Sequence, residues 1–315
     1  MPGTPPGRLD WMENNPAGST IWLFAIENKT GRLAGTISLF PKHLYIDNKR
    51  IKAAILGDFM VHRDFRVFGP ALDLLKAARA YQNKGDFDLL YTIPNPQSVA
   101  VAKRVGFRSA GRLYIMMHPQ RLDFLLERHI PHYMAKILNP LGMAALKLVS
   151  RETYVNSVGL IEKIDWQDEA FTEFVAKMRK CRTGLMAGEY SLSYLDWRYR
   201  RNPEYDFKVF TFRIEAGSSI LGFFVFTLDK NHLELYDIVA LEDKILLMMI
   251  KKVGVICREA KCRGIYSMVY ERNPLLPLLK KCCFFDTKDQ IELYLYAEKM
   301  EGMGCWAFTS ADRNI

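Results

Sequence analysis

Apolar residues along the chain follow two spacings, one typical of strands and the other typical of helices. Turn-forming residues such as Lys29-Thr30-Gly31 separate the apolar runs. In the first third of the chain the predicted elements are strands at 21–27, 33–40, 51–61, 87–92 and 111–117 and helices at 70–83 and 96–105. This order predicts a meander of strands that leads into a strand–helix–strand–helix–strand unit.

Two segments far apart in the chain share a short motif. Leu9-Asp10-Trp11 is followed by Asn15-Pro16, and Leu195-Asp196-Trp197 is followed by Asn202-Pro203, with one additional residue in between. A strand-like run comes after each copy. Self-similarity of this kind indicates an internal duplication.

Two further landmarks support the duplication. Asn95-Pro96 opens the segment NPQSVAVAKRVGF, and Asn273-Pro274 opens the equally long segment NPLLPLLKKCCFF. Asp58 precedes Asn95 by 37 residues, and Asp237 precedes Asn273 by 36. Because the landmarks occur in the same order at matching separations, we expect the elements of the first copy to recur over residues 208–296.

The duplication predicts an α/β (α+β) chain of two tandem domains. The first covers residues 1–117 and the second residues 157–300, with a helical connector at 118–156 and a tail at 301–315. The second copy opens with an extra strand at 158–164 and two helices, for which the first copy has no room. We therefore expect the opening strand of the first domain to be missing.

Length and charge narrow the class of partner. The 315 residues are 49% hydrophobic, which is enough to bury the cores of two ordinary domains. The formal net charge of +9 favours a polyanionic partner. Because the basic residues are scattered instead of gathered on one helix or stripe, nucleic acid is disfavoured as the main partner. A small phosphate-rich ligand needs far fewer positive groups.

The cysteines and histidines predict neither a disulfide framework nor a metal site. There is no CxxC pair, and the N-terminal segment lacks the apolar core of a secretory leader, so we expect free thiols in the cytoplasm. His129 and His132 are separated by a proline and lack a third ligand nearby in the sequence. The six cysteines crowd the second half: Cys181, Cys257, Cys262, Cys282, Cys283 and Cys305.

No apolar run reaches the roughly 18 residues that a membrane-crossing helix requires. Residues 134–150 come closest, but Lys136, Asn139, Pro140 and Lys147 interrupt them. We therefore expect no membrane span.

Residues 61–71 connect the long predicted strand to the first major helix and contain the pattern R-x-x-G-x-A, formed by Arg66, Gly69 and Ala71. The N-terminus of a helix has unsatisfied N–H donors and a partial positive charge. Small residues let the backbone approach phosphate oxygens, and an arginine adds a fork of donors. The pattern therefore predicts a site for a pyrophosphate group.

This segment resembles the pyrophosphate-binding signature of the GNAT acyltransferases, [Q/R]-x-x-G-x-[G/A]. Asn95 and Val105-Gly106-Phe107 also fall where that superfamily has its N-x-x-A-x-x-x-Y-x-x-x-G-F helix. The resemblance implies two GNAT-like domains, each a mixed, mostly antiparallel twisted sheet flanked by helices. The tandem copies of the Trp and Asn-Pro motif also resemble acyltransferases found beside bacterial polysaccharide-assembly genes.

The resemblance implies direct attack of an amine on the thioester of acetyl-CoA or another acyl-CoA, without an acyl-enzyme and without a metal. A backbone N–H near Met60 or Val61 would polarise the thioester carbonyl. Asn95 also fits a helix cap. The expected cofactor-binding residues are Met60, Val61, Arg66, Val67, Phe68, Gly69, Pro70, Ala71, Asn95 and Ser98.

Two departures from the superfamily pattern concern the loop and the general acid. Pro70 has no N–H, so one donor of the phosphate cradle is missing, although proline suits a first helical turn. The tyrosine that often protonates the leaving thiolate aligns with Ala102. Another group or water must then supply that proton.

The candidate for a general base is Asp58, followed by His62. Asp58 belongs to the strand that is expected to face the acyl group. Against this role stands Asp237, which keeps the same place in the second copy. A structural role for both carboxylates is therefore the alternative.

The second copy lacks the arginine and glycine of the phosphate loop, and Ile245 and Leu246 stand near its helix start. We expect this degenerate half not to bind coenzyme A and to complete the acceptor pocket instead. Aromatic and cationic side chains on residues 190–201 suit a sugar or an anionic acceptor, and an amphipathic helix that packs into the core is the alternative. The candidates are Tyr190, Tyr194, Trp197 and Arg198.

The leading functional hypothesis is acyl-CoA-dependent N-acyl transfer to a small amine, such as an amino sugar or an amino acid. A second hypothesis is tRNA-dependent aminoacyl transfer of the FemABX type, which the positive charge favours and the phosphate loop disfavours. A third is a non-catalytic GNAT-like binding module, consistent with the missing tyrosine. The sequence leaves the oligomeric state open.

Overall fold

The first half of the chain forms the predicted meander followed by two helix–strand pairs. Helix α2 has the bounds predicted from the apolar pattern. The computed structural model describes residues 6–47, 49–66, 69–156, 158–289, 291–297 and 305–313. The elements of the first half are α1 (Arg8–Glu13), β1 (Ile21–Ile26), β2 (Leu33–Ile46), β3 (Lys49–Val61), the 3₁₀ turn η1 (Arg63–Phe65), α2 (Pro70–Asn83), β4 (Leu89–Thr92), α3 (Pro96–Arg104) and β5 (Arg108–Pro119).

A helical connector and the second half follow. The connector contains α4 (Asp123–Leu126), α5 (His132–Val149) and the 3₁₀ turn η2 (Arg151–Tyr154). The second half contains β6 (Leu160–Lys163), α6 (Glu169–Cys181), β7 (Leu185–Gly188), α7 (Leu192–Leu195), the π-helical turn η3 (Asp196–Arg200), β8 (Lys208–Arg213), β9 (Gly222–Leu228), β10 (His232–Ala240), α8 (Asp243–Glu259), β11 (Gly264–Tyr270), α9 (Leu275–Lys281), β12 (Phe285–Asp286), β13 (Ile291–Tyr296), β14 (Cys305–Trp306) and the 3₁₀ turn η4 (Ser310–Asp312).

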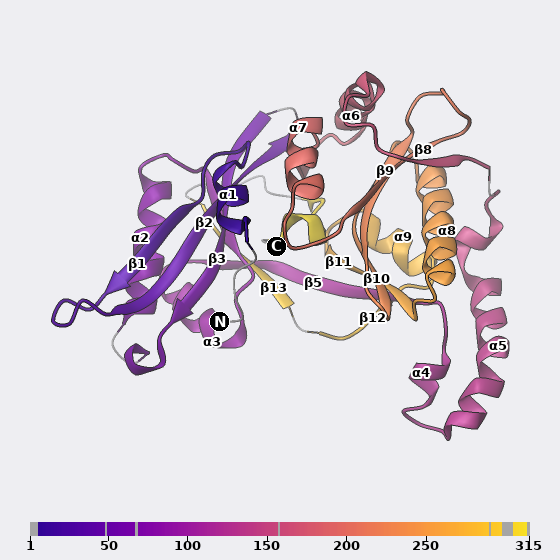
Figure 1. Ribbon diagram of the computed structural model, residues 1–315, viewed down its shortest axis with the longest axis horizontal. Coiled ribbons are helices and arrows are strands. Elements are labelled where there is room, and N and C mark those ends of the chain that lie inside the picture. The colour runs from indigo at the N-terminus through magenta and orange to yellow at the C-terminus, as the bar shows by residue number, and fades with distance from the viewer. Residues whose placement is uncertain are drawn as a thin grey trace.

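The two halves repeat one order of elements and join in a single mixed, mostly antiparallel sheet (Figure 1). The series β1-β2-β3-α2-β4-α3 in the first half matches β8-β9-β10-α8-β11-α9 in the second. Across the described sheet the strands follow the order β14-β7-β2-β3-β4-β13-β5-β11-β10-β9-β8-β6, with β1 beside β2 and β12 beside β5. The chain is therefore a tandem duplication of one α/β unit.

The halves exchange strands where they meet. Strand β13, from the end of the second half, lies between β4 and β5 of the first. In return, the C-terminal part of β5 lies between β11 and β12 of the second. Each half therefore completes the sheet of the other, and the shared strand β5 runs past the expected boundary at residue 117.

Three groups of buried side chains form the core. One lies beneath α2 and includes Leu75 and Phe107, and a second lies beneath α8 and includes Phe224 and Met249. The third joins the halves and contains both tryptophans of the repeated motif. Residues 305–313, predicted as a tail, are part of this arrangement, because β14 pairs with β7 and Phe308 is fully buried.

Helices α4 and α5 project from one end of the molecule at the lower right of Figure 1. Helix α5 is the longest described helix, yet neither it nor any other helix in the described ranges is both long and apolar enough to cross a bilayer.

Candidate functional site

Strands β3 and β4 run parallel and then diverge. They pair over residues 53–55 and 89–91, and the Thr92 hydroxyl donates to the Leu56 carbonyl at 3.4 Å. Beyond this point β3 continues to Val61 and stays paired with β2. One edge of residues 57–61 is therefore left without a neighbouring strand in the described sheet, so its backbone groups can meet a ligand.

A β-bulge bends β3 where the strands diverge. The register between β2 and β3 shifts between Thr36 and Ser38, and Asp58 has a positive φ of 45°. A bulge re-aims the side chains beside it and increases the local twist. Asp58 is thereby turned at the point where β3 leaves β4.

The loop after β3 ends on an open glycine. Gly69 is the N-cap of α2 with φ of 88°, and a Cβ placed there would meet no heavy atom of the described residues within 4 Å. Helix α2 begins at Pro70, as expected for a residue without a backbone donor. The space beside Gly69 thus suits the close approach of phosphate oxygens to a positively polarised helix end. The predicted contacts Val67 and Phe68 lie outside the described residues.

Arg66 and His62 lie on either side of the short turn η1. The exposed Arg66 side chain donates through Nε to the Val61 carbonyl at 3.4 Å. The His62 ring accepts from the Asp64 N–H at 3.4 Å and therefore caps η1. Arg66 lies three residues before Gly69 and contacts the end of β3, whereas the ring of His62 is turned along the chain toward Asp64.

Arg8 connects Asp58 to the second half of the chain. Its Nη2 lies 3.2 Å from Asp58 Oδ1, and its Nε lies 2.5 Å from Glu204 Oε1. The Ser38 hydroxyl also donates to Asp58, at 3.1 Å. Asp58 is thus held by an ion pair with Arg8 and a hydrogen bond from Ser38.

Asn95 and Ser98 form the cap of α3. The Asn95 Oδ1 accepts from both the N–H and the hydroxyl of Ser98, each at 3.0 Å. This is the capping geometry that satisfies an orphan helix donor. Ala102, aligned with the superfamily tyrosine, is buried in the core beneath α2 and provides no acid.

The second copy has an acidic cavity where the first has its open loop. A volume of about 310 Å³ lies between the end of β10 and the starts of α8 and α9. Glu242 and Asp243 at the start of α8 line it together with Leu246. Carboxylates at a helix N-terminus repel phosphate, so Glu242 and Asp243 disfavour a pyrophosphate at the start of α8, although Arg182 also lines the cavity.

Asp237 lines the same cavity and is almost fully buried. Burial, and next the charge of Asp312, raise the pKa of Asp237 to about 7. Asp237 and Asp58 occupy equivalent strands, but Asp58 is ion-paired and partly exposed. The two carboxylates therefore have different electrostatic environments.

The segment predicted to bind the acceptor lies in the core between the halves. Trp197 stacks on Trp11, and Arg198 donates to the Ala311 carbonyl at 3.1 Å. An acceptor would reach Trp197 and Arg198 only if the interface opened, whereas Tyr190 lines the 310 Å³ cavity. The role of the segment in acceptor binding stays a prediction. Less than a tenth of each predicted residue is exposed: Tyr190, Tyr194, Trp197 and Arg198.

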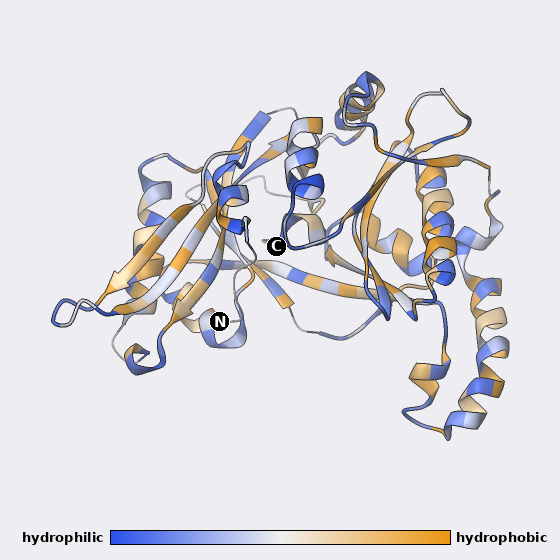
Figure 2. Cartoon of the chain, in the orientation of Figure 1, coloured by the Kyte–Doolittle hydropathy of each residue, from blue (hydrophilic) through white to orange (hydrophobic). Residues whose placement is uncertain are grey.

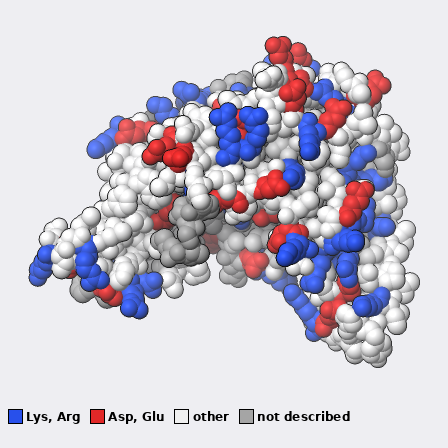
Figure 3. All heavy atoms as spheres, in the orientation of Figure 1, with Lys and Arg blue, Asp and Glu red and all other residues white. Residues whose placement is uncertain are grey.

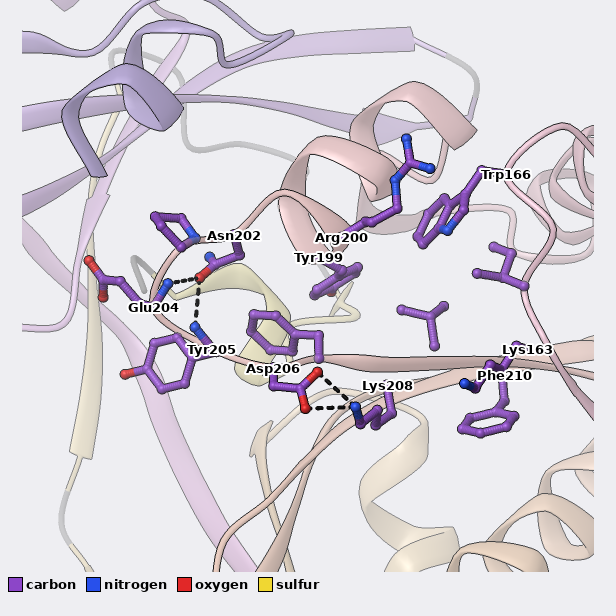
Figure 4. Close-up of a pocket in the computed structure, with 14 residues that line it drawn as sticks. Lys163, Trp166, Tyr199, Arg200, Asn202, Glu204, Tyr205, Asp206, Lys208 and Phe210 are labelled. Atoms are coloured by element: carbon purple, nitrogen blue, oxygen red, sulfur yellow. Dashed lines mark hydrogen bonds and ion pairs between the residues drawn. The ribbon is translucent and has the colours of Figure 1, made fainter. Parts of the chain in front are cut away.

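A larger cavity of about 510 Å³ lies beside the strand β8, lined by residues 163–164, 166, 199–200 and 202–210 (Figure 4). Trp166, Tyr199 and Tyr205 give it aromatic walls. Glu204, the ion-pair partner of Arg8, also lines it. One guanidinium group therefore connects this cavity to Asp58 on β3.

Asn202 fixes the turn along one wall of that cavity. Its Oδ1 accepts from the N–H groups of Glu204 and Tyr205 at 2.9 and 3.0 Å, as the dashed lines of Figure 4 show. Its Nδ2 is buried and has no partner in the part of the chain that the structure describes. A buried amide donor without a partner can bind a ligand oxygen.

Sequence reasoning missed Arg8 and most of this cavity. The available signal was the Asn202-Pro203 motif, which marks the turn that carries Glu204 and Tyr205. Trp166 gave no signal, because it reaches the cavity from a different segment. In the described ranges no three His, Cys, Asp or Glu side chains converge as metal ligands, and all six cysteines are free thiols.

No protein-family model matches the sequence, and no curated protein matches it. Solved structures do match. A GCN5-related N-acetyltransferase from Anabaena variabilis aligns with a TM-score of 0.61 at 12% identity, over 87% of this chain and 62% of its own. Saccharomyces cerevisiae N-myristoyltransferase with bound myristoyl-CoA aligns with a TM-score of 0.57 at 13% identity, over 91% and 69%.

A tandem GNAT protein from the clavulanic acid biosynthesis pathway aligns with a TM-score of 0.53 at 14% identity, over 89% of this chain and 83% of its own. At these identities the likeness establishes the fold. The chain has the fold of the GNAT acyltransferases in its tandem form, with a degenerate second copy, and it spans less than two thirds of the Anabaena protein.

Proposed function

We propose that the protein is an acyl-CoA-dependent N-acyltransferase that acts on a small amine in the cytoplasm. The observation that carries this proposal is the open Gly69 at the N-terminus of α2, directly after the point where β3 and β4 diverge. A pyrophosphate fits the helix end, and the thioester arm fits the free edge of residues 57–61. Acyl-CoA supplies the activated carbonyl.

The acceptor amine attacks the thioester carbonyl carbon directly. The new C–N bond forms, the C–S bond breaks, and the departing sulfur takes the electron pair and, directly or through water, the second proton of the nitrogen. Asp58 is the residue that we assign to take the amine proton. Because Arg8 is ion-paired with Asp58, we infer that the acceptor ammonium takes the place of that guanidinium on binding and gives its first proton to the carboxylate.

The 510 Å³ cavity is the acceptor site that we infer. Aromatic faces and hydrogen-bonding groups together suit a ring that carries hydroxyl groups, so an amino sugar fits better than a simple amino acid. Arg8 joins Glu204 in this cavity to Asp58. An amine held there therefore needs only to displace one side chain to reach the proposed base.

The test begins with binding. Acetyl-CoA and longer acyl-CoA thioesters should raise the melting temperature of the wild type by several degrees at about 100 times Kd. Gly69→Glu should remove this shift through its bulk and charge. Gly85→Glu is the matched control, since Gly85 has a φ of 82°, has no heavy atom within 4 Å of a Cβ, and lies just beyond the other end of α2.

Thiol release then tests catalysis. The wild type, supplied with an acyl-CoA and a panel of amino sugars and amino acids, should release free coenzyme A in the presence of its acceptor. A wild type that no acyl-CoA stabilises would contradict the proposal and favour the tRNA-dependent alternative. Stabilisation without thiol release from any amine would instead indicate a binding module.

A further inference from the structure

Helix α5 exposes a broad apolar face. Tyr133, Ile137, Leu141 and Leu148 are 65%, 66%, 66% and 71% exposed, although large apolar side chains are normally buried. At about 100° per residue they fall within one narrow sector of the helix, and Met134, Leu138 and Val149 widen it to an arc of about 160°. Figure 2 shows hydrophobic residues recurring along this projecting helix. An apolar surface of this extent marks an interaction site.

The opposite face of α5 holds the helix to the protein. The Asn139 side chain accepts from the Leu122 N–H at 2.6 Å, and Ala135 is fully buried. Met143 and Leu146 line a cavity of about 250 Å³ that faces α8. The exposed face is therefore not needed for the core, so it is free to meet a partner.

The surroundings of this face are cationic. Residues 132–151 contain Lys136, Lys147 and Arg151 and no acidic residue. On the helix, the two lysines lie about 40–60° outside the apolar arc, along one of its borders. Lys and Arg outnumber Asp and Glu where α5 and α8 lie in Figure 3. The chain as a whole has a net charge of +9.

We propose that α5 docks on the surface of an anionic lipid bilayer, with its apolar face inserted at the headgroup boundary and its lysines on the phosphates. Apolar area on one side and flanking cations are the two features that such interfacial helices use. The helix lies on the bilayer and does not cross it.

A second copy of the chain fits this face less well. An antiparallel pairing of two α5 helices centred between Leu141 and Gly142 would bring Lys136 of one copy beside Lys147 of the other. Two lysines side by side repel each other and destabilise the contact between the copies. An anionic surface instead neutralises both lysines, so the charges favour lipid.

Vesicle sedimentation of the full chain tests the proposal. Large vesicles of phosphatidylcholine with about 30% phosphatidylglycerol should retain the wild type at low salt and release it at high salt, because exposed charges are screened. Ile137→Glu/Leu141→Glu should lower the partition coefficient at least tenfold. Lys136→Gln and Lys147→Gln should each lower it about fivefold.

The matched control is Ile214→Glu, which places the same charge at an exposed isoleucine that lies just after β8, outside α5. It should bind vesicles like the wild type, and all variants should keep the wild-type melting temperature. The proposal would be overturned if the wild type were monomeric and did not bind anionic vesicles. The proposal would also be overturned if Ile137→Glu/Leu141→Glu bound vesicles as well as the wild type does. A wild-type dimer that dissociates in this variant and does not bind vesicles would overturn it too.

Discussion

Trp11 and Trp197 form a reciprocal pair at the centre of the molecule. Their rings stack with centroids 4.7 Å apart and an interplanar angle of 7°. Each indole Nε1 donates to the backbone carbonyl of the other residue at 2.8 Å. The two residues come from the two copies of the repeated motif, so each copy of the motif binds the other across the interface of the halves.

This reciprocity predicts that the two tryptophans are energetically coupled. Trp197→Phe removes one hydrogen bond, leaves the Trp11 carbonyl unpaired and opens a small void, so we expect a loss of about 2–4 kcal/mol in the free energy of unfolding. Trp11→Phe should cost a similar amount. The double variant should lose less than the sum, because either change alone already reduces the contact between the two rings.

Urea unfolding of the single and double variants measures this coupling. Trp22→Phe is a suitable control, because Trp22 is only partly buried on β1 and belongs to no such pair. Strictly additive losses for Trp11 and Trp197 would show that the two rings act independently, contrary to this interpretation.

The sequence was sufficient to predict β1–β5, α2 and α3 of the first half, but not the helix α1. The apolar spacing predicts α2, and Gly69-Pro70 marks its start. The Asn95 cap marks the start of α3. The duplication was also predictable, because its landmarks are short motifs with fixed separations. The helices and strands depend on residues close in the chain, and the duplication needs only a comparison of short local motifs.

The strand exchange was not predictable from the same patterns. The apolar alternation in β5 and β13 is satisfied equally by a neighbour from either half, so it does not choose between them. The placement of Arg8 between Asp58 and Glu204 likewise depends on three segments that meet only in the folded chain. To predict that Trp197 lies in the core, one would have had to know that it packs against Trp11.

The ion pair of Arg8 with Asp58 leads to a prediction about catalysis. Asp58→Asn keeps the shape of the side chain but cannot take a proton, so we expect kcat to fall by about 10²–10⁴-fold. The acetyl-CoA-induced rise in melting temperature should stay unchanged, because Asp58 lies outside the phosphate loop. Steady-state thiol release and thermal shifts measure the two effects.

Arg8→Gln complements that variant. Removing the guanidinium leaves Asp58 without its cation, and the acceptor ammonium no longer has to displace it, so KM for the acceptor should decrease. If Asp58→Asn retained full kcat, the proton would have another destination, and a structural role for Asp58 would be the better interpretation.

Asp237 should make stability depend on pH. Burial raises its pKa from 3.8 to about 7 in the folded state. Between these pH values the folded protein holds a proton that the unfolded chain has released, so the free energy of unfolding falls as pH rises from about 4 to 7. The shift corresponds to a loss on the order of 4 kcal/mol. The buried Asp237 carboxylate therefore lowers the free energy of unfolding at pH 8 but not at pH 4.

Asp237→Asn removes the titration and preserves the acceptor for the Ile238 N–H, which lies 2.9 Å from Asp237 Oδ1. We expect the variant to be more stable than the wild type at pH 8 and similar to it near pH 4. Urea unfolding at both pH values provides the measurement. A difference between variant and wild type that is the same at both values would mean that Asp237 does not titrate in this range.

If the cavity beside β8 binds the acceptor, a substitution in its wall should weaken acceptor binding without changing coenzyme A binding. Tyr205 contributes an aromatic wall to it and is 40% exposed, so Tyr205→Ala removes a stacking surface with little effect on the core. We expect KM for a hydroxylated amine to rise about tenfold, the effect of losing one ring contact of roughly 1–1.5 kcal/mol. Phe285→Ala changes a similarly exposed ring on β12, outside the cavity, and should leave KM unchanged. Equal effects of the two substitutions would place the acceptor elsewhere.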